Sequence, residues 1–148
     1  MPGHPPKQKR EASSPQTRRI QRFAAAAYAC FVLVISLLPG AALPVVPDWN
    51  LLFSPDKIAH FGVYAIFALL LSAIFTERRK LWGLIAAIGL AGTFGGLMEV
   101  LQGTVTAGRS FDPVDMVANL LGAAFGGICY LVLQRITTSP STPVEDNN

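Results

Sequence analysis

Four long apolar stretches, separated by short polar segments, constrain this sequence more than any other feature. They cover residues 23–38, 58–75, 81–101 and 114–133. A helix needs about 20 mostly apolar residues to cross a bilayer. The first stretch is short by this measure, but apolar residues resume at 41–43. Since only structures that satisfy every backbone hydrogen bond internally cross a bilayer, we predict an all-α membrane protein, a four-helix transmembrane bundle.

Composition supports this prediction and excludes other classes of protein. Of the 148 residues, 51% are hydrophobic and 14% are charged, whereas soluble domains carry about 25% charged residues. The lipid bilayer is therefore an expected partner. Nucleic acid is not, because the basic residues do not cluster on a soluble face. Cys30 and Cys129 both lie inside apolar stretches, where they cannot form a CxxC motif.

The two ends of the chain have a different composition. Residues 1–22 and 136–148 are rich in polar residues and proline, and we predict that both are disordered, with the bundle in 23–135. The basic leader and the first apolar stretch also resemble a cleaved signal peptide. We favour a retained helix, because the stretch is long for a signal peptide and Pro44 follows closely.

The positions of the basic residues predict an orientation. Of the twelve Lys and Arg residues, ten lie in the N-terminal segment, in the turn at 78–80 or at Arg135. Alternate loops of a four-helix bundle lie on the same side of the membrane, and cytoplasmic loops are enriched in Lys and Arg. We therefore predict that both termini are cytoplasmic, with Lys57 and Arg109 on the outer side.

Polar side chains gather near the outer ends of three predicted helices. At about 100° per residue, those in each helix share one arc. On the last two helices this arc coincides with the spacings Gly92-xxx-Gly96 and Gly122-xxx-Gly126, which let neighbouring helices approach closely. The ten residues are Asp56, Lys57, His60, Tyr64, Glu99, Gln102, Arg109, Asp112, Asp115 and Asn119. Because ionisable groups inside a membrane are costly, we interpret them as one outward-facing polar pocket.

Within this pocket, His60 and Glu99 are the candidate catalytic pair, because neither has a structural role as a helix cap. As an acid–base pair, the two would transfer protons. Lys57 and Arg109 are candidates to bind an anionic group such as phosphate. The other candidate substrate-binding residues are Asp56, Tyr64, Gln102, Asp112, Asp115 and Asn119.

Several of these residues also have structural explanations. Asp112 followed by Pro113 is typical of a helix start, and Asn119 could join two helices by a hydrogen bond. Lys57 and Arg109 could be ion-pair partners of Asp56 and Asp112. Four carboxylates against two basic side chains leave a formal charge of −2 with His60 neutral. Protonation or a bound cation must therefore compensate the pocket.

The sequence offers one possible set of metal ligands and no motif for a cofactor. His60, Glu99 and Asp115 could hold a metal ion, because His and carboxylate ligands bind Zn²⁺. Their spacing matches no recognised metal motif, so we predict no metal site. The sequence also contains no P-loop, dinucleotide-binding or nucleophile-elbow motif, and it identifies no cofactor.

The polar residues form two motifs that resemble those of the VanZ-like family of small bacterial membrane proteins. The first is Asp56-Lys57-xx-His60-Phe61-xx-Tyr64. The second contains Glu99, Gln102, Arg109, Asp112, Asp115, Asn119 and Gly122. The end of the first apolar stretch, with Ser36, Pro39 and Gly40, is also similar, and the resemblance covers about residues 30–126. It implies a bacterial inner-membrane protein with a cell-envelope role, the family theme being resistance to the glycopeptide teicoplanin.

Two functional hypotheses follow. In the first, the pocket binds or acts on a lipid-linked or cell-wall polysaccharide group, and whether it is an enzyme stays open. In the second, the protein is a non-catalytic accessory subunit of an envelope or exopolysaccharide system, bound to a membrane partner protein. An ion path is disfavoured, because the inner halves of the apolar stretches are nearly free of polar groups.

Overall fold

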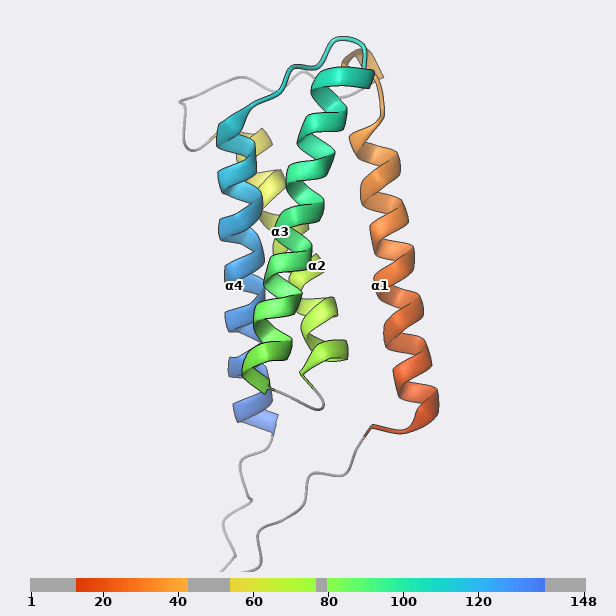
Figure 1. The fold of residues 1–148 in the computed structure, drawn as a ribbon, viewed down its shortest axis with the longest axis vertical. Coiled ribbons are helices and arrows are strands. Elements are labelled where there is room, and N and C mark those ends of the chain that lie inside the picture. Colours follow the sequence, from red (N-terminus) through yellow and green to blue (C-terminus); the bar gives the residue numbers. More distant parts are fainter. Residues whose placement is uncertain (1–12, 43–53, 77–79, 138–148) are drawn as a thin grey trace, which may run out of the picture.

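A computed structural model describes residues 13–42, 54–76 and 80–137. These form four helices, all long and apolar enough to cross a membrane, and the described residues contain no strand (Figure 1). They are α1 (Pro15–Ser36), α2 (Pro55–Phe75), α3 (Lys80–Val105) and α4 (Pro113–Thr137), with a short 3₁₀ turn, η1 (Gly40–Ala42). The prediction of an all-α, four-helix membrane protein is confirmed at this level.

The ends of the bundle differ from the predicted boundaries. Residues 15–22, predicted to be disordered, form the first turns of α1. The helix starts there because the Ser14 hydroxyl accepts a hydrogen bond from the Thr17 amide, 3.1 Å away, and Pro15 suits the first helical position. At the other end, α4 continues to Thr137, two residues beyond the predicted boundary. Residues 1–12 and 138–148, also predicted to be disordered, lie outside the described residues.

α2 is the central element of the bundle, because it packs against each of the other three helices. Its closest neighbour is α4: a Cβ atom added to Gly122 or Gly126 would overlap the carbonyl oxygens of Phe61 and Ala65 on α2. The two backbones are therefore in direct contact, as the small-residue spacing on α4 predicts. α1 stands to one side and packs mainly along α2 (Figure 1).

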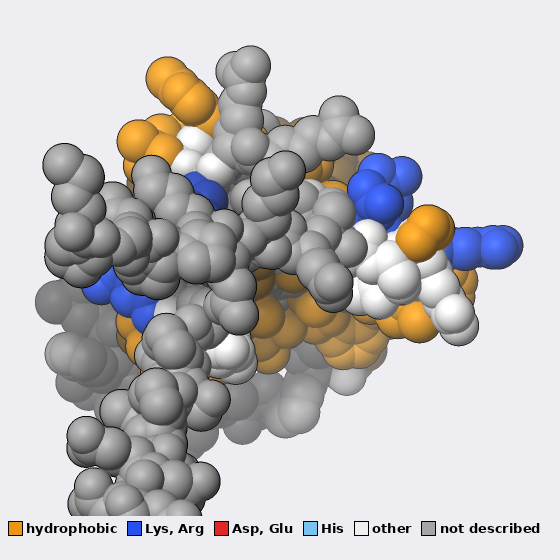
Figure 2. All heavy atoms as spheres, turned by 90° about the horizontal axis from the view of Figure 1, so that it is seen from below, with side chains coloured by type: hydrophobic (Ala, Val, Ile, Leu, Met, Phe, Trp, Pro, Cys, Tyr) orange, Lys and Arg blue, Asp and Glu red, His pale blue; other side chains and the backbone are white. Residues whose placement is uncertain are grey.

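Charge is separated along the bundle. The start of α1 and the end of α4 lie at the same end (Figure 1), and Figure 2 shows Lys and Arg side chains around that end. The described basic residues there are Arg18, Arg19, Arg22, Lys80 and Arg135. The Asp and Glu residues of the described ranges lie near the opposite ends of the helices, at Asp56, Glu99, Asp112 and Asp115. Lys7, Lys9, Arg10, Arg78 and Arg79, used to predict the orientation, lie outside the described residues.

Candidate functional site

The acidic end of the bundle is built from the starts of α2 and α4 and the end of α3. Both α2 and α4 begin with a proline. At α4, the Asp112 carboxylate accepts a hydrogen bond from the Val114 amide at 2.8 Å, so the predicted helix start is confirmed. This places Asp115 in the first turn, where the helix dipole stabilises a negative charge.

Lys57 joins α2 to α4 through two carboxylates. Its ammonium nitrogen lies 3.0 Å from Asp112 Oδ2 and 3.1 Å from Asp115 Oδ1. The predicted ion-pairing role of Lys57 is therefore seen with these two residues, and Asp56 is not its partner in the described structure. The Val114 amide, together with the nearby Lys57 ammonium, lowers the pKa of Asp112. Lys57 thus fixes the relative positions of two acidic groups that would otherwise repel each other.

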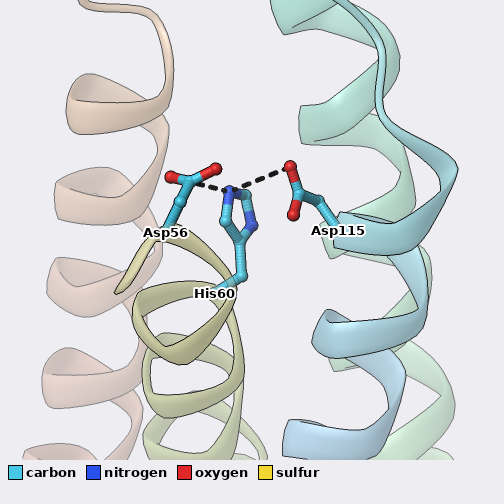
Figure 3. Close-up of side chains that lie close together, drawn as sticks. All are labelled: Asp56, His60 and Asp115. Carbon is cyan, nitrogen blue, oxygen red and sulfur yellow. Dashed lines mark ion pairs between the residues drawn. The ribbon is translucent and has the colours of Figure 1, made fainter. Parts of the chain in front are cut away.

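His60 lies between carboxylates from two different helices (Figure 3). Its Nε2 is 3.9 Å from Asp56 Oδ1, one turn earlier on α2, and 3.9 Å from Asp115 Oδ2 on α4. Its other ring nitrogen, Nδ1, is 2.9 Å from the side-chain oxygen of Asn119, also on α4. Asn119 is therefore the predicted interhelical hydrogen-bond partner, and it fixes the plane of the imidazole.

Glu99 is almost completely buried, with 1% of its surface exposed. Its Oε1 accepts a hydrogen bond from the backbone amide of Asp112 at 2.9 Å, so it holds the start of α4 against α3. Its Oε2 is buried and has no hydrogen-bond partner in the part of the chain that the structure describes. His60 and Glu99, predicted as an acid–base pair, do not bond to each other in the described structure, and their catalytic roles stay predictions.

Two neighbouring cavities open at this end of the bundle, each of about 260 Å³. The first lies between α1 and α2, and most of its wall is apolar, including Val32, Ile35 and Val63. The second is polar and is bordered by Glu99, Asp112 and Asp115 among others. Both cavities are lined by the same three polar residues, Asp56, Gln102 and Arg109.

The ten predicted site residues are brought together. Eight line one cavity or both, namely Asp56, His60, Tyr64, Glu99, Gln102, Arg109, Asp112 and Asp115. The other two, Lys57 and Asn119, support this lining by bonding to Asp112, Asp115 and His60. The residues singled out from the sequence thus lie together in space, and their role as a functional site stays a prediction; the contacts among them differ from the predicted His60–Glu99 pairing.

The contribution of α1 to the site was not predicted from the residues. Val32, Ile35 and Ser36 form one wall of the apolar cavity. The end of α1 is tied to the α3–α4 loop by a hydrogen bond of 3.2 Å from the Gly40 amide to the Ala107 carbonyl. A Cβ atom on Gly40 would lie only 2.7 Å from the Gly108 carbonyl oxygen, so glycine is required there. The only signal for this contact was the resemblance at Ser36, Pro39 and Gly40.

The side chains that the structure brings together as possible metal ligands differ from the set that the sequence suggested, His60, Glu99 and Asp115. Ligand atoms of Asp56, His60 and Asp115 all lie within 4.8 Å of one another (Figure 3). Asp56, and not Glu99, is therefore the third possible ligand beside His60 and Asp115. The side chains come from the first turns of α2 and α4, which the direct backbone contact between these helices holds in register.

Comparison with known proteins supports the resemblance seen in the motifs. A protein of the fission yeast Schizosaccharomyces pombe, described as uncharacterized, is 35% identical over 95 residues, which cover 63% of this chain. The match spans 56% of that relative, little more than half of its length. No solved structure matches. The family model described as VanZ/LLP1 matches residues 5–134, which include α1, α2, α3 and all but the last three residues of α4, and this chain therefore belongs to the VanZ/LLP1 family.

Proposed function

We propose that this multi-pass membrane protein binds a phosphorylated lipid, with the phosphate in the polar cavity and the hydrocarbon chain in the apolar cavity. The acidic end of the bundle faces the outside of the cytoplasmic membrane, and both termini are cytoplasmic. The excess of Lys and Arg at the opposite end supports this orientation.

The observation that carries the proposal is the sharing of Asp56, Gln102 and Arg109 by an apolar and a polar cavity. A lipid with a charged head group needs such a pair of adjoining environments. The apolar cavity lies between α1 and α2, the side on which a hydrocarbon chain can enter from the bilayer. A soluble sugar or peptide would gain nothing from this apolar wall.

Arg109 is the residue best placed to bind the phosphate. It lines both cavities, and it forms no ion pair within 4.0 Å among the described residues. Lys57, by contrast, is already engaged by two carboxylates. Because a guanidinium group can donate two parallel hydrogen bonds to a phosphate, we assign this role to Arg109.

The envelope theme of the family favours a lipid that carries a cell-wall or polysaccharide unit. In this reading Tyr64, Gln102 and Asp56 contact the lipid at the junction of the cavities, and Glu99 and His60 are candidates for proton transfer to or from its head group. Resistance to glycopeptide antibiotics would follow only indirectly, through the state of the cell envelope.

Binding of undecaprenyl phosphate to the full-length protein in nanodiscs, measured by native mass spectrometry, tests the proposal. We expect binding of the phosphate and much weaker binding of undecaprenol, which lacks the charge. Arg109→Gln should weaken binding about tenfold, because it removes a charge-assisted bidentate contact. Ala59→Trp should also weaken it, because Ala59 lines the apolar cavity and the larger ring would fill it.

Leu121→Trp is the matched control, since Leu121 is 58% exposed on α4 and lines neither cavity. It should bind the lipid as the unmodified protein does. If undecaprenol binds equally well, or if Arg109→Gln and Ala59→Trp both bind as Leu121→Trp does, the proposal is wrong. The accessory-subunit hypothesis would then be preferred.

A further inference from the structure

Asp56, His60 and Asp115 face one another across the contact between α2 and α4 (Figure 3). Both carboxylates lie 3.9 Å from the same ring nitrogen of His60. This distance is too long for a hydrogen bond. It suits two ligands of one metal ion, because bonds of 2.0–2.2 Å place ligand atoms about 3–4 Å apart. All three ligand atoms lie within 4.8 Å of one another, and a small rotation of the exposed Asp56 carboxylate would bring its oxygen closer to the other two.

The hydrogen bond between His60 and Asn119 prepares the histidine for this role. Asn119 Oδ1 lies 2.9 Å from Nδ1, and a carbonyl oxygen accepts a proton but cannot donate one. Nδ1 therefore carries a hydrogen, and in the neutral imidazole the lone pair is then on Nε2, the nitrogen that lies 3.9 Å from a carboxylate oxygen of Asp56 and of Asp115. Metal-binding histidines are commonly oriented in this way by a second hydrogen bond from the other ring nitrogen.

Two further observations point to a cation. Among the described residues, the Oε2 atom of Glu99, on a side chain that is 1% exposed, has no hydrogen-bond partner, and Glu99 lines the same polar cavity as Asp56 and Asp115. An unpartnered carboxylate oxygen is costly at such a position. The four carboxylates also exceed the two basic side chains of the site, Lys57 and Arg109, by two charges. One divalent cation would neutralise this excess.

We therefore infer that Asp56, His60 and Asp115 bind a divalent transition-metal ion of the Mn²⁺ or Zn²⁺ type. One imidazole and two carboxylates suit these ions better than Ca²⁺ or Mg²⁺, which prefer oxygen ligands alone. Asp115 serves two partners, since its Oδ1 is bonded to Lys57 and its Oδ2 faces His60. His60 is then a ligand, and Glu99 stays the candidate for proton transfer.

A bound metal ion would also make the polar cavity more favourable for the phosphate of the proposed lipid. A phosphate would meet net negative charge in the polar cavity, and an ion held by Asp56 and Asp115 would supply positive charge there. This link rests on the proposed function, whereas metal binding itself rests only on the geometry of the three side chains.

Metal binding is tested with the full-length protein in detergent, stripped with a chelator and titrated with Mn²⁺ in the absence of added lipid. Electron paramagnetic resonance measures the free ion, and the visible absorption of added Co²⁺ reports a bound imidazole. Asp56→Asn, His60→Ala and Asp115→Asn should each weaken Mn²⁺ binding about tenfold or more, and His60→Ala should also change the Co²⁺ spectrum. Asp56→Asn is the decisive variant, because the Asp56 side chain is 54% exposed and this change of one atom should leave the fold intact.

Asp112→Asn is the matched control, since it removes one charge from the same end of the bundle without removing a proposed ligand. It should weaken Mn²⁺ binding only about twofold to threefold, the effect of one unit charge several ångströms away. Absence of Mn²⁺ binding to the unmodified protein would overturn the inference. So would equal effects of Asp56→Asn and Asp112→Asn, which would mean general attraction of cations. Because no lipid is present, this result is independent of the lipid-binding test.

Discussion

At the scale of single residues, Asn119 shows how a buried amide can determine the chemistry of its neighbour. It is 1% exposed, and its oxygen fixes which nitrogen of His60 carries the proton. The sequence indicated that Asn119 could join two helices by a hydrogen bond, but it did not identify His60 as the partner. The direct bond turns Asn119 into a positioning residue for His60.

Replacing Asn119 should therefore change metal binding without removing a ligand. We expect Asn119→Leu to weaken Mn²⁺ binding about tenfold or more, within the range seen when the hydrogen-bond partner of a ligand is lost. Asn119→Asp keeps an oxygen that accepts the hydrogen bond, so it should restore binding. The same Mn²⁺ titration measures both variants. If Asn119→Asp binds as weakly as Asn119→Leu, the amide acts through packing and the positioning role is wrong.

At the scale of helices, the site depends on how closely α2 and α4 approach. Gly122 and Gly126 lie one turn apart on α4 and leave space only for the backbone of α2. This contact sets the register between the first turns of the two helices, where Asp56, His60 and Asp115 meet. By contrast, Gly92 and Gly96 of α3 face the ends of flexible side chains, those of Leu120 and Met116. The Gly-xxx-Gly spacing of α4 thus allows two backbones to touch, whereas the same spacing on α3 accommodates side chains.

Gly126→Ala should destabilise the bundle by about 1–3 kcal/mol, because the added methyl group overlaps the Ala65 carbonyl and forces the helices apart. Gly62→Ala is the control, since a Cβ atom at Gly62 meets nothing within 4 Å. It should leave stability unchanged or raise it slightly, because alanine favours the helix. Reversible unfolding in mixed detergent micelles measures both. Equal stability of the two variants would contradict the close contact of α2 with α4.

At the scale of the whole molecule, the described charges are separated: basic side chains lie around the start of α1 and the end of α4 (Figure 2), and the acidic ones lie at the site. The positive-inside rule gives this asymmetry a direction. In the proposed orientation the site would face the outer leaflet, where a lipid-linked envelope group could reach it and a cytoplasmic nucleotide could not.

Cysteine labelling tests this orientation. In a variant with Cys30→Ala and Cys129→Ala, Ser110→Cys places a thiol on the α3–α4 loop, and Thr137→Cys places one at the end of α4. A membrane-impermeant maleimide added to intact cells should label the cysteine at 110, and the cysteine at 137 only after the membrane is opened. Labelling of 137 in intact cells, with 110 protected, would show the opposite orientation.

The sequence predicted much of the fold and most of the residues of the site. The length of the apolar stretches identified four helices, and helical angles placed His60, Glu99 and Asp115 on faces that turn toward neighbouring helices, whereas Asp56 is exposed. The start of α1 was missed because the polar composition of residues 15–22 outweighed the cap signal of Ser14 and Pro15. The partner of His60 was missed because helical angles place residues on a face but do not relate two helices to each other.

By itself, the sequence determined four helices long and apolar enough to cross a membrane, and it placed Asp56, Glu99, Asp112 and Asp115 near the ends of helices that meet in the bundle. Hydropathy and helical period are local properties, so they can be read along the chain. Only the tertiary structure decided that His60 faces Asp56 and Asp115, that Glu99 holds the start of α4, and that α1 completes an apolar cavity. These contacts depend on how far each helix is shifted along the bundle axis, and how it is rotated about its own axis, relative to its neighbours. They are set by contacts between residues far apart in sequence, such as that of Gly126 with the backbone of Ala65.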